Sequence, residues 1–150
     1  MIVVRPLQPS DEAAWPRLWR GYLAFYETTL PETVYAASFA RLTDPMIRDC
    51  LGMIALRDGA LVGLVHCIVH RHGWRIEDVT YLQDLYVAPE ARGTGVGRAL
   101  IEAIYAEADA AGRPEVYWLT QDFNTVARRL YDRIGEATPF VKYRCRTPAQ

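Results

Sequence analysis

Apolar residues recur along this chain with two different periods, and the period predicts where strands and helices lie. Short runs rich in β-branched and aromatic residues favour strands, whereas apolar residues three and four apart favour helices with one buried face. The expected strands are 2–7, 51–57, 61–70, 81–87, 115–121 and 140–146. The expected helices are 15–26, 32–42, a helix from the glycines near 95 to a break at 112–114, and 125–134.

Local signals refine these boundaries. Ser10 or Asp11 is placed to cap the first helix, while Pro16 predicts a late start or a kink. Asp58 and Gly59 between two apolar runs predict a two-residue hairpin turn. Antiparallel runs flanking one strand–helix–strand unit indicate a mixed α+β sheet in one domain, 1–150.

Composition narrows the class of protein. A chain of 150 residues, 51% hydrophobic, is long enough for one domain with a sizeable core. A net charge of −1 gives no reason to expect a nucleic-acid partner, and the longest apolar stretch, 61–69, is too short to span a membrane. The 3 cysteines form no paired spacing and the amino terminus lacks a signal-peptide pattern, so a cytoplasmic location is expected.

The junction after the 81–87 strand carries the strongest chemical signal. Gly93, Gly95 and Gly97 stand where a helix begins, although glycine in a helix costs about 1 kcal/mol relative to alanine. Exposed N–H groups and the helix dipole favour anion binding at such a terminus, so a phosphate site is indicated, with a flexible connection as the plain alternative. The spacing fits neither a dinucleotide fingerprint nor a nucleoside-triphosphatase loop.

The pattern Arg92-x-x-Gly95-x-Gly97 resembles the acetyl-CoA signature of the GNAT N-acetyltransferase superfamily, and the order of elements resembles the GNAT fold over essentially the whole chain. That resemblance implies a mostly antiparallel central sheet with splayed central strands, flanked by helices, and acetyl-CoA as cofactor. Strand backbone would hold its pantetheine, and amides of the glycine turn would hold its pyrophosphate. The implied residues are Leu85, Tyr86, Val87, Arg92, Gly93, Thr94, Gly95, Val96, Gly97 and Arg98.

A second stretch, Asn124-x-x-Ala127-x-x-Leu130-Tyr131, resembles the second cofactor motif of the same family. The resemblance implies that Asn124 and Ala127 contact the cofactor, with the asparagine on pantetheine. It also implies that Tyr131 donates a proton to the departing thiolate. The structural alternatives are that Asn124 only caps a helix and that Tyr131 belongs to the core.

The 81–87 strand is similar to that of the diamine (spermidine/spermine) acetyltransferases. In many relatives a glutamate in this strand is the assigned catalytic base. This chain has Gln83 there, and an amide cannot accept a proton at neutral pH. A regular strand would point the adjacent Asp84 to the opposite face unless a bulge intervenes. The catalytic candidates are therefore Tyr131, Gln83 and Asp84, with proton removal through ordered water and Asp84 as candidate carboxylate. Asp84 as a structural acid is the alternative.

Candidates for the acceptor site combine aromatic rings with carboxylates, which suits a cationic amine. They are Tyr22, Tyr26, Glu27, Trp74, Glu77 and Asp78. The alternative places Trp74 in the core and the acids on a solvated rim. No metal is expected, because His66, His70 and His72 lack a thiolate or carboxylate pattern around them.

These features predict an acetyl-CoA-dependent N-acetyltransferase that moves an acetyl group directly to a small cationic primary amine within a ternary complex. A protein lysine or N-terminal acetyltransferase and a non-catalytic acyl-CoA-binding module are the alternatives. The expected partner is a small-molecule amine, with no nucleic acid and no membrane. A homodimer is compatible with the sequence, which does not give the oligomeric state.

Overall fold

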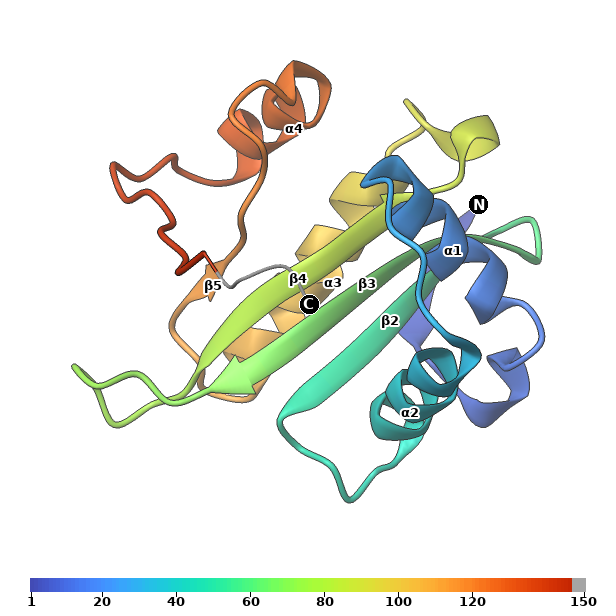
Figure 1. Ribbon diagram of the computed structural model, residues 1–150, viewed down its shortest axis with the longest axis horizontal. Coiled ribbons are helices and arrows are strands. Elements are labelled where there is room, and N and C mark those ends of the chain that lie inside the picture. The colour runs from blue at the N-terminus through green and yellow to red at the C-terminus, as the bar shows by residue number, and fades with distance from the viewer. Residues whose placement is uncertain (147–150) are drawn as a thin grey trace. The chain divides into compact units, whose positions relative to one another are not determined.

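The computed structural model describes residues 1–146 (Figure 1). It contains two compact units, 1–119 and 120 onward, which are described separately. In the first unit one sheet has the strand order β1-β2-β3-β4-β5. Its strands are β1 (Ile2–Pro6), β2 (Cys50–Arg57), β3 (Ala60–His70), β4 (Val79–Val87) and β5 (Val116–Tyr117). All neighbours pair antiparallel except β4 and β5, which are parallel.

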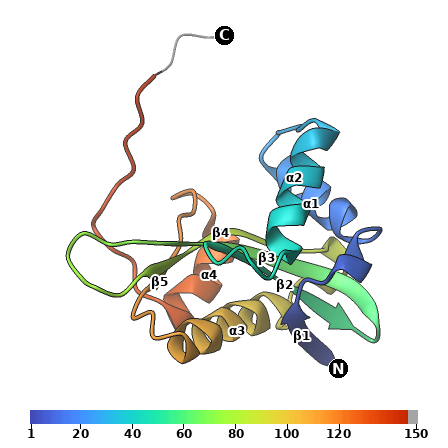
Figure 2. The same cartoon turned by 90° about the horizontal axis from the view of Figure 1, so that it is seen from below.

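Helices cover both faces of this sheet. Helices α1 (Trp15–Phe25) and α2 (Glu32–Thr43) lie on one face, and α3 (Val96–Ala110) lies on the other (Figure 2). Short 3-10 turns occupy Pro9–Asp11 and Pro89–Ala91. The α+β architecture is the one predicted. The second unit contains α4 (Thr125–Ile134), with the predicted bounds.

Helix α1 starts late, as Pro16 predicts, but the capping prediction is wrong. The residue before the helix is Ala14, which has no side-chain cap, and Pro16 lies in the first turn. The carboxylate of Asp11 instead accepts two hydrogen bonds of 2.8 Å from the guanidinium of Arg5 and one of 2.8 Å from the Gln8 N–H. The nearby arginine therefore holds the pKa of Asp11 below its ordinary value.

Two strand predictions fail at the carboxyl-terminal end of the chain. The segment 115–121 forms a strand only at Val116 and Tyr117, and 140–146 forms none. An extended segment becomes a strand only where its N–H and C=O groups find a ladder partner, which alternation in the sequence does not supply. The hairpin turn, by contrast, is confirmed, because Asp58 and Gly59 both have positive φ (52° and 81°).

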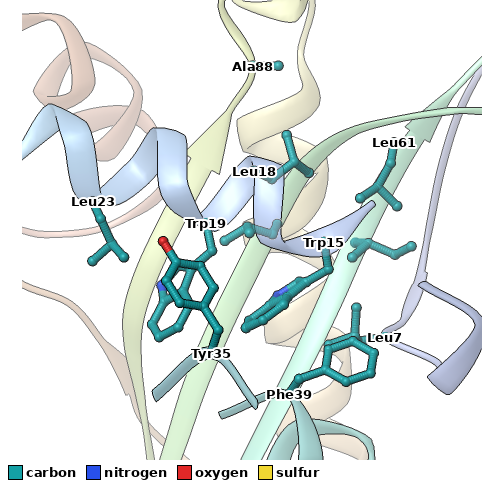
Figure 3. Close-up of a cluster of buried hydrophobic side chains, with 11 residues drawn as sticks. Leu7, Trp15, Leu18, Trp19, Leu23, Tyr35, Phe39, Leu61 and Ala88 are labelled. Atoms are coloured by element: carbon teal, nitrogen blue, oxygen red, sulfur yellow. The ribbon is translucent and has the colours of Figure 1, made fainter. Parts of the chain in front are cut away.

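An aromatic cluster fixes α1 and α2 over the sheet. Trp15 and Trp19 of α1 lie beside Tyr35 and Phe39 of α2 (Figure 3). The ring centroids of the two tryptophans are 5.1 Å apart, and that of Phe39 is 5.2 Å from Trp15. Rings packed this closely hold the two indole N–H groups in fixed positions above β3 and β4.

Candidate active site

Strand β4 is irregular where the predicted catalytic residues lie. His66 of β3 pairs with Asp84, but the next residue, Cys67, pairs with Leu82, so Gln83 is an extra residue on β4. The side chain of Gln83 is exposed, whereas Asp84 is only 6% exposed and is bonded to Trp19 of α1. The bulge interrupts the alternation of β4, and Asp84 lies on the α1 face, where it meets Trp19.

Four buried side chains form what we call the Asp84 network: Trp15, Trp19, His66 and Asp84. The indole N–H of Trp19 donates to Asp84 Oδ2 at 3.1 Å, and His66 Nδ1 lies 2.9 Å from the same oxygen. The indole N–H of Trp15 donates to His66 Nε2 at 2.9 Å. The side chains of β3, β4 and α1 are therefore linked through one carboxylate.

Three tyrosines surround the network: Tyr22 on α1, Tyr26 directly after α1, and Tyr81 on β4. Burial raises the pKa of each phenol, and the negative charge of Asp84 raises these pKa values further. The hydroxyl of Tyr22 lies 3.4 Å from the backbone oxygen of Gln83. With raised pKa values these phenols remain protonated near neutral pH, so they can donate hydrogen bonds but do not act as bases.

The predicted acceptor residues fall into two groups. Tyr22 and Tyr26 lie at the Asp84 network, and the exposed Glu27 follows α1. Trp74, Glu77 and Asp78 belong to the β3–β4 loop, which lies away from α1 (Figure 1). The alternative of a core Trp74 is wrong, because that side chain is 89% exposed. Glu77 lies in a depression with the segment after α3, lined also by Gly112, Arg113 and Pro114.

Sequence reasoning missed the residues that hold Asp84. Trp15 and Trp19 read as core positions of a helix, and Tyr81 was noted only within a motif. The available signal was His66, a polar residue inside the apolar run 61–69. A buried polar group needs hydrogen-bond partners, so it points to a polar site within the core.

The glycine turn leaves the amino terminus of α3 open. Gly93 and Gly95 have φ values of 73° and 90°, which L side chains rarely adopt. A Cβ at either position would meet nothing within 4 Å, so neither glycine is required by packing. Gly95 provides no side-chain cap for α3, and the first-turn N–H groups therefore remain for an anion.

Arginines flank this turn. Arg57 reaches Thr94 Oγ1 at 3.4 Å and the backbone oxygen of Glu90 at 3.3 Å. Arg92 Nε donates to the backbone oxygen of Val87 at 3.0 Å. Positive charge beside uncapped N–H groups fits the pyrophosphate of acetyl-CoA.

Strand β4 also has a free backbone edge. Only Thr80 and Tyr81 pair with β5, so among the strands that the structure describes the remaining edge of β4, 82–87, has no ladder partner on that side. The backbone of Leu85 is thus available for amides of a bound pantetheine, whereas the oxygen of Val87 already accepts from Arg92 Nε. This separation of β4 from β5 is the predicted splay of the central strands.

In the second unit, Asn124 is the N-cap of α4, as its structural alternative stated. Its Oδ1 accepts from the Ala127 N–H at 3.4 Å, and its Nδ2 donates to Thr120 Oγ1 at 3.3 Å. Tyr131 is half-buried on α4. Contact of Asn124, Ala127 and Tyr131 with acetyl-CoA stays a prediction.

The histidines have separate roles. His66 belongs to the Asp84 network, whereas His70 contacts the hydroxyl of Tyr117 at 2.7 Å. Within residues 1–146 no group of three or more His, Cys, Asp and Glu side chains is arranged to hold a metal ion. In the same range no helix is long and apolar enough to cross a membrane.

Known proteins share this sequence pattern and fold. The model of the acetyltransferase (GNAT) family matches residues 14–135. The chain is 41% identical to a D-amino-acid N-acetyltransferase of Saccharomyces cerevisiae, over 95% of this chain and 89% of that protein. It is 30% identical to an uncharacterized N-acetyltransferase of Bacillus subtilis, over 98% and 99% of the two chains.

Solved structures agree on the fold. A probable acetyltransferase superposes with a TM-score of 0.83 at 24% identity, over 100% of this chain and 99% of the other. The aminoglycoside N-acetyltransferase AAC(6')-Iy, bound to a bisubstrate analogue that contains CoA, superposes with a TM-score of 0.78 at 20% identity, over 97% and 99%. The family match, together with the open glycine turn and the free edge of β4, establishes that this chain belongs to the GNAT family and is an acetyl-CoA-dependent N-acetyltransferase.

Proposed function

We propose that this N-acetyltransferase acts on a small primary amine that binds as an ammonium ion beside Asp84 and receives the acetyl group directly, within a ternary complex. The observation that carries the proposal is a buried carboxylate that has no lysine or arginine partner among the described residues. Asp84 is 6% exposed, and among the described residues its only ion-pair partner is the imidazole of His66. Burying a carboxylate costs free energy, which a bound ammonium would help to offset.

The surrounding tyrosines are also suited to bind an ammonium ion. Tyr22, Tyr26 and Tyr81 present ring faces and hydroxyl oxygens, and both attract an ammonium ion. The rings of Tyr22 and Tyr26 are 5.1 Å apart, and Tyr81 stacks on Tyr117 at 4.9 Å. These contacts form an aromatic wall on the α1 face of the sheet, next to the carboxylate.

Asp84 is also the proposed proton acceptor. An alkylamine has a pKa near 10.4, so making it neutral at pH 7 costs about 4–5 kcal/mol. Asp84 takes this proton directly or through a water molecule, and the exposed amide of Gln83 helps to orient that water. The amine nitrogen then forms the new C–N bond as the C–S bond of the thioester breaks.

The cofactor side of the site follows from the glycine turn and from family resemblance. Acetyl-CoA supplies the thioester. The 92–98 turn holds its pyrophosphate. The backbone of 85–87 and the side of α4 that carries Asn124 and Ala127 contact its pantetheine. Tyr131 donates its phenolic proton to the leaving sulfur.

Two classes of acceptor have support. The 81–87 strand resembles that of the diamine acetyltransferases, which favours a small cationic amine, and Glu27 beyond α1 would attract a second ammonium. The loop with Trp74, Glu77 and Asp78 adds nothing to this reading, since it lies away from α1 (Figure 1). The 41% identity to a D-amino-acid N-acetyltransferase favours an amino acid as the second candidate.

Thiol release from acetyl-CoA tests the acceptor. The panel is spermidine, a monoamine of similar length, a D-amino acid with its L enantiomer, and a lysine-bearing peptide, each at low and high salt. We expect the best small amine to exceed the peptide at least about tenfold in kcat/KM. A peptide that matches it would overturn the proposal in favour of a protein acetyltransferase.

The same panel separates the two small-molecule classes. A preference for spermidine over the monoamine that weakens with salt indicates recognition of a second charge by exposed acids. A D-amino acid that exceeds both its enantiomer and spermidine indicates an amino-acid enzyme. Equal rates for the monoamine and spermidine at low salt would remove the polyamine reading.

The role of Tyr131 has its own test. Tyr131→Phe keeps the ring and removes the proton, so we expect kcat to fall on the order of 10²-fold with little change in cofactor affinity. A kcat within about twofold of the parent would show that the hydroxyl takes no part in the reaction.

A further inference from the structure

We infer that His66 is a positioning residue: Trp15 fixes its tautomer, and its imidazole orients the carboxylate of Asp84 for the acceptor amine. The inference rests on the proposed role of Asp84 as proton acceptor. It adds a function for His66 and for the two tryptophans of α1. All three are buried, at 6%, 1% and 7% exposed for His66, Trp15 and Trp19.

Hydrogen bonding fixes which nitrogen of His66 carries the proton. The indole N–H of Trp15 can only donate, so His66 Nε2, 2.9 Å away, must accept. The ring proton therefore resides on Nδ1, which donates to Asp84 Oδ2 at 2.9 Å. A proton on Nε2 would oppose the indole N–H, so this hydrogen bond requires the Nδ1–H form.

His66 is not itself the base. Both ring nitrogens are engaged, one by Trp15 and the other by Asp84, and the side chain is buried between them. No ring nitrogen is left to meet an amine. Its contribution therefore reaches the substrate only through the carboxylate.

The network acts on Asp84 in two ways. Donors on a carboxylate favour its ionised form, and here two of them, from His66 and Trp19, converge on Oδ2. They also fix the plane of the carboxyl group. The hydroxyl of Tyr22 also contacts Asp84, and the ammonium would bind the carboxylate beside it.

Other titratable groups near Asp84 do not compete as bases in the acidic range. They are Tyr22 from α1, Tyr26 directly after it, Tyr81 from β4 and Cys67 from β3. Burial is the largest cause that raises the pKa of each of these groups, so all four stay protonated at and below neutral pH. The acidic limb of the activity profile should therefore report on the Asp84 network.

The kinetic test compares His66→Phe with His66→Gln. Phenylalanine keeps a ring but removes both polar atoms, so the anion loses a donor and a higher pH is needed to ionise the carboxyl group. We expect the acidic limb of kcat/KM to move up by about one pH unit and kcat/KM near pH 7 to fall about tenfold. Glutamine carries one donor and one acceptor at a similar spacing and should restore much of both.

His70→Phe is the matched control, because His70 lies on the same strand and contacts a tyrosine hydroxyl rather than Asp84. It should leave the acidic limb in place. The inference is overturned if His66→Phe, shown to be folded by its thermal transition, has the parental limb. It is equally overturned if His66→Gln shifts the limb as far as His66→Phe.

Nitrogen-15 NMR of the side chain gives a readout without catalysis. In the parent protein we expect the Nδ1–H form of His66 near neutral pH, and in Trp15→Phe, which removes the donor to Nε2, a mixture of the two neutral tautomers. An Nε2–H form in the parent overturns the inference even if His66→Phe does not fold. Full activity of Asp84→Asn would instead refute Asp84 as proton acceptor, whatever tautomer is observed.

Discussion

The two faces of the sheet are built differently. On the α3 face the buried side chains of the helix are apolar, with Val96, Leu100, Ile101 and Ile104 at 0–1% exposed. The buried hydroxyl of Thr80 accepts a hydrogen bond from Arg113, which follows this helix. On the α1 face the tryptophans and phenylalanine of the cluster lie beside two buried polar groups, His66 and Asp84. One face is therefore covered mainly by aliphatic side chains, whereas the other encloses a carboxylate among aromatic rings.

That contrast separates residues that hold the fold from residues that serve the reaction. The aliphatic part of the α3 face shows that much of this sheet can be covered by apolar side chains, and such packing stabilises the fold without a buried carboxylate. Burying Asp84 requires two indole or imidazole donors and a bulge in β4 to aim it. Stability alone does not call for that arrangement, so it points to function.

The largest effect should come from Asp84→Asn on the α1 face. Asparagine keeps the shape and one accepting oxygen but cannot take a proton, so we expect kcat/KM to fall on the order of 10³-fold while the free energy of unfolding changes by about 1 kcal/mol. Steady-state rates with the preferred acceptor and urea unfolding measure the two quantities. Asp58→Asn, the same change in the exposed hairpin turn, should alter neither.

An active Asp84→Asn variant would place the buried carboxylate in a structural role. A large loss of stability without a specific loss of activity would point the same way. The two faces would then differ only in how they pack.

On the α3 face, Leu100→Ala should have the opposite signature. Removing this fully buried side chain leaves a cavity that costs about 3 kcal/mol of unfolding free energy, whereas kcat/KM of the folded fraction should stay within about fivefold. Urea unfolding and rates below the transition give both numbers. A loss of activity as large as that of Asp84→Asn would break the contrast between the faces.

A glycine under α3 offers a matched control. A Cβ on Gly63 would lie 2.9 Å from Val96 Cγ1 and 3.0 Å from Leu100 Cδ1, so Gly63→Ala alone is overpacked. In the double variant that combines Gly63→Ala with Leu100→Ala, the new methyl group enters space that the Leu100 side chain has left. The combined loss should be smaller than the sum of the two single losses.

The sequence predicted the α3 face more fully than the α1 face. Helical spacing of Val96, Leu100 and Ile104 is enough to place an apolar helix on a sheet. The orientation of Asp84 depends on a bulge, which arises from the pairing of two strands and leaves no distinct pattern in either one. Sequence reasoning could therefore name Asp84 and the condition for its use, but not the partners that hold it.

The predictions of strands near the carboxyl terminus failed for a related reason. The segments 115–121 and 140–146 have the composition of strands, yet only Val116 and Tyr117 pair. Whether an extended segment joins a sheet depends on the neighbour it meets, which is a property of the whole fold. The cofactor motif at the glycine turn was easier to predict than these strands, because Gly93 and Gly95 need positive φ values that few other residues tolerate.

The α3 face also contributes to the proposed function, at the amino-terminal end of its helix. Gly95 precedes α3 with φ of 90° and open space around it. Gly95→Asp would set a carboxylate where the pyrophosphate is proposed to bind, so calorimetry should show acetyl-CoA affinity at least about tenfold weaker, or about 1.4 kcal/mol.

Gly95→Asn is the matched control, since asparagine has nearly the same size and also tolerates positive φ. The aspartate variant should bind more weakly than the asparagine variant, and the gap should narrow with added salt because it comes from charge repulsion. Equal affinities would mean that bulk or backbone strain, rather than an anion at this terminus, accounts for the effect, and parental affinity in both would remove the glycine turn from the cofactor site.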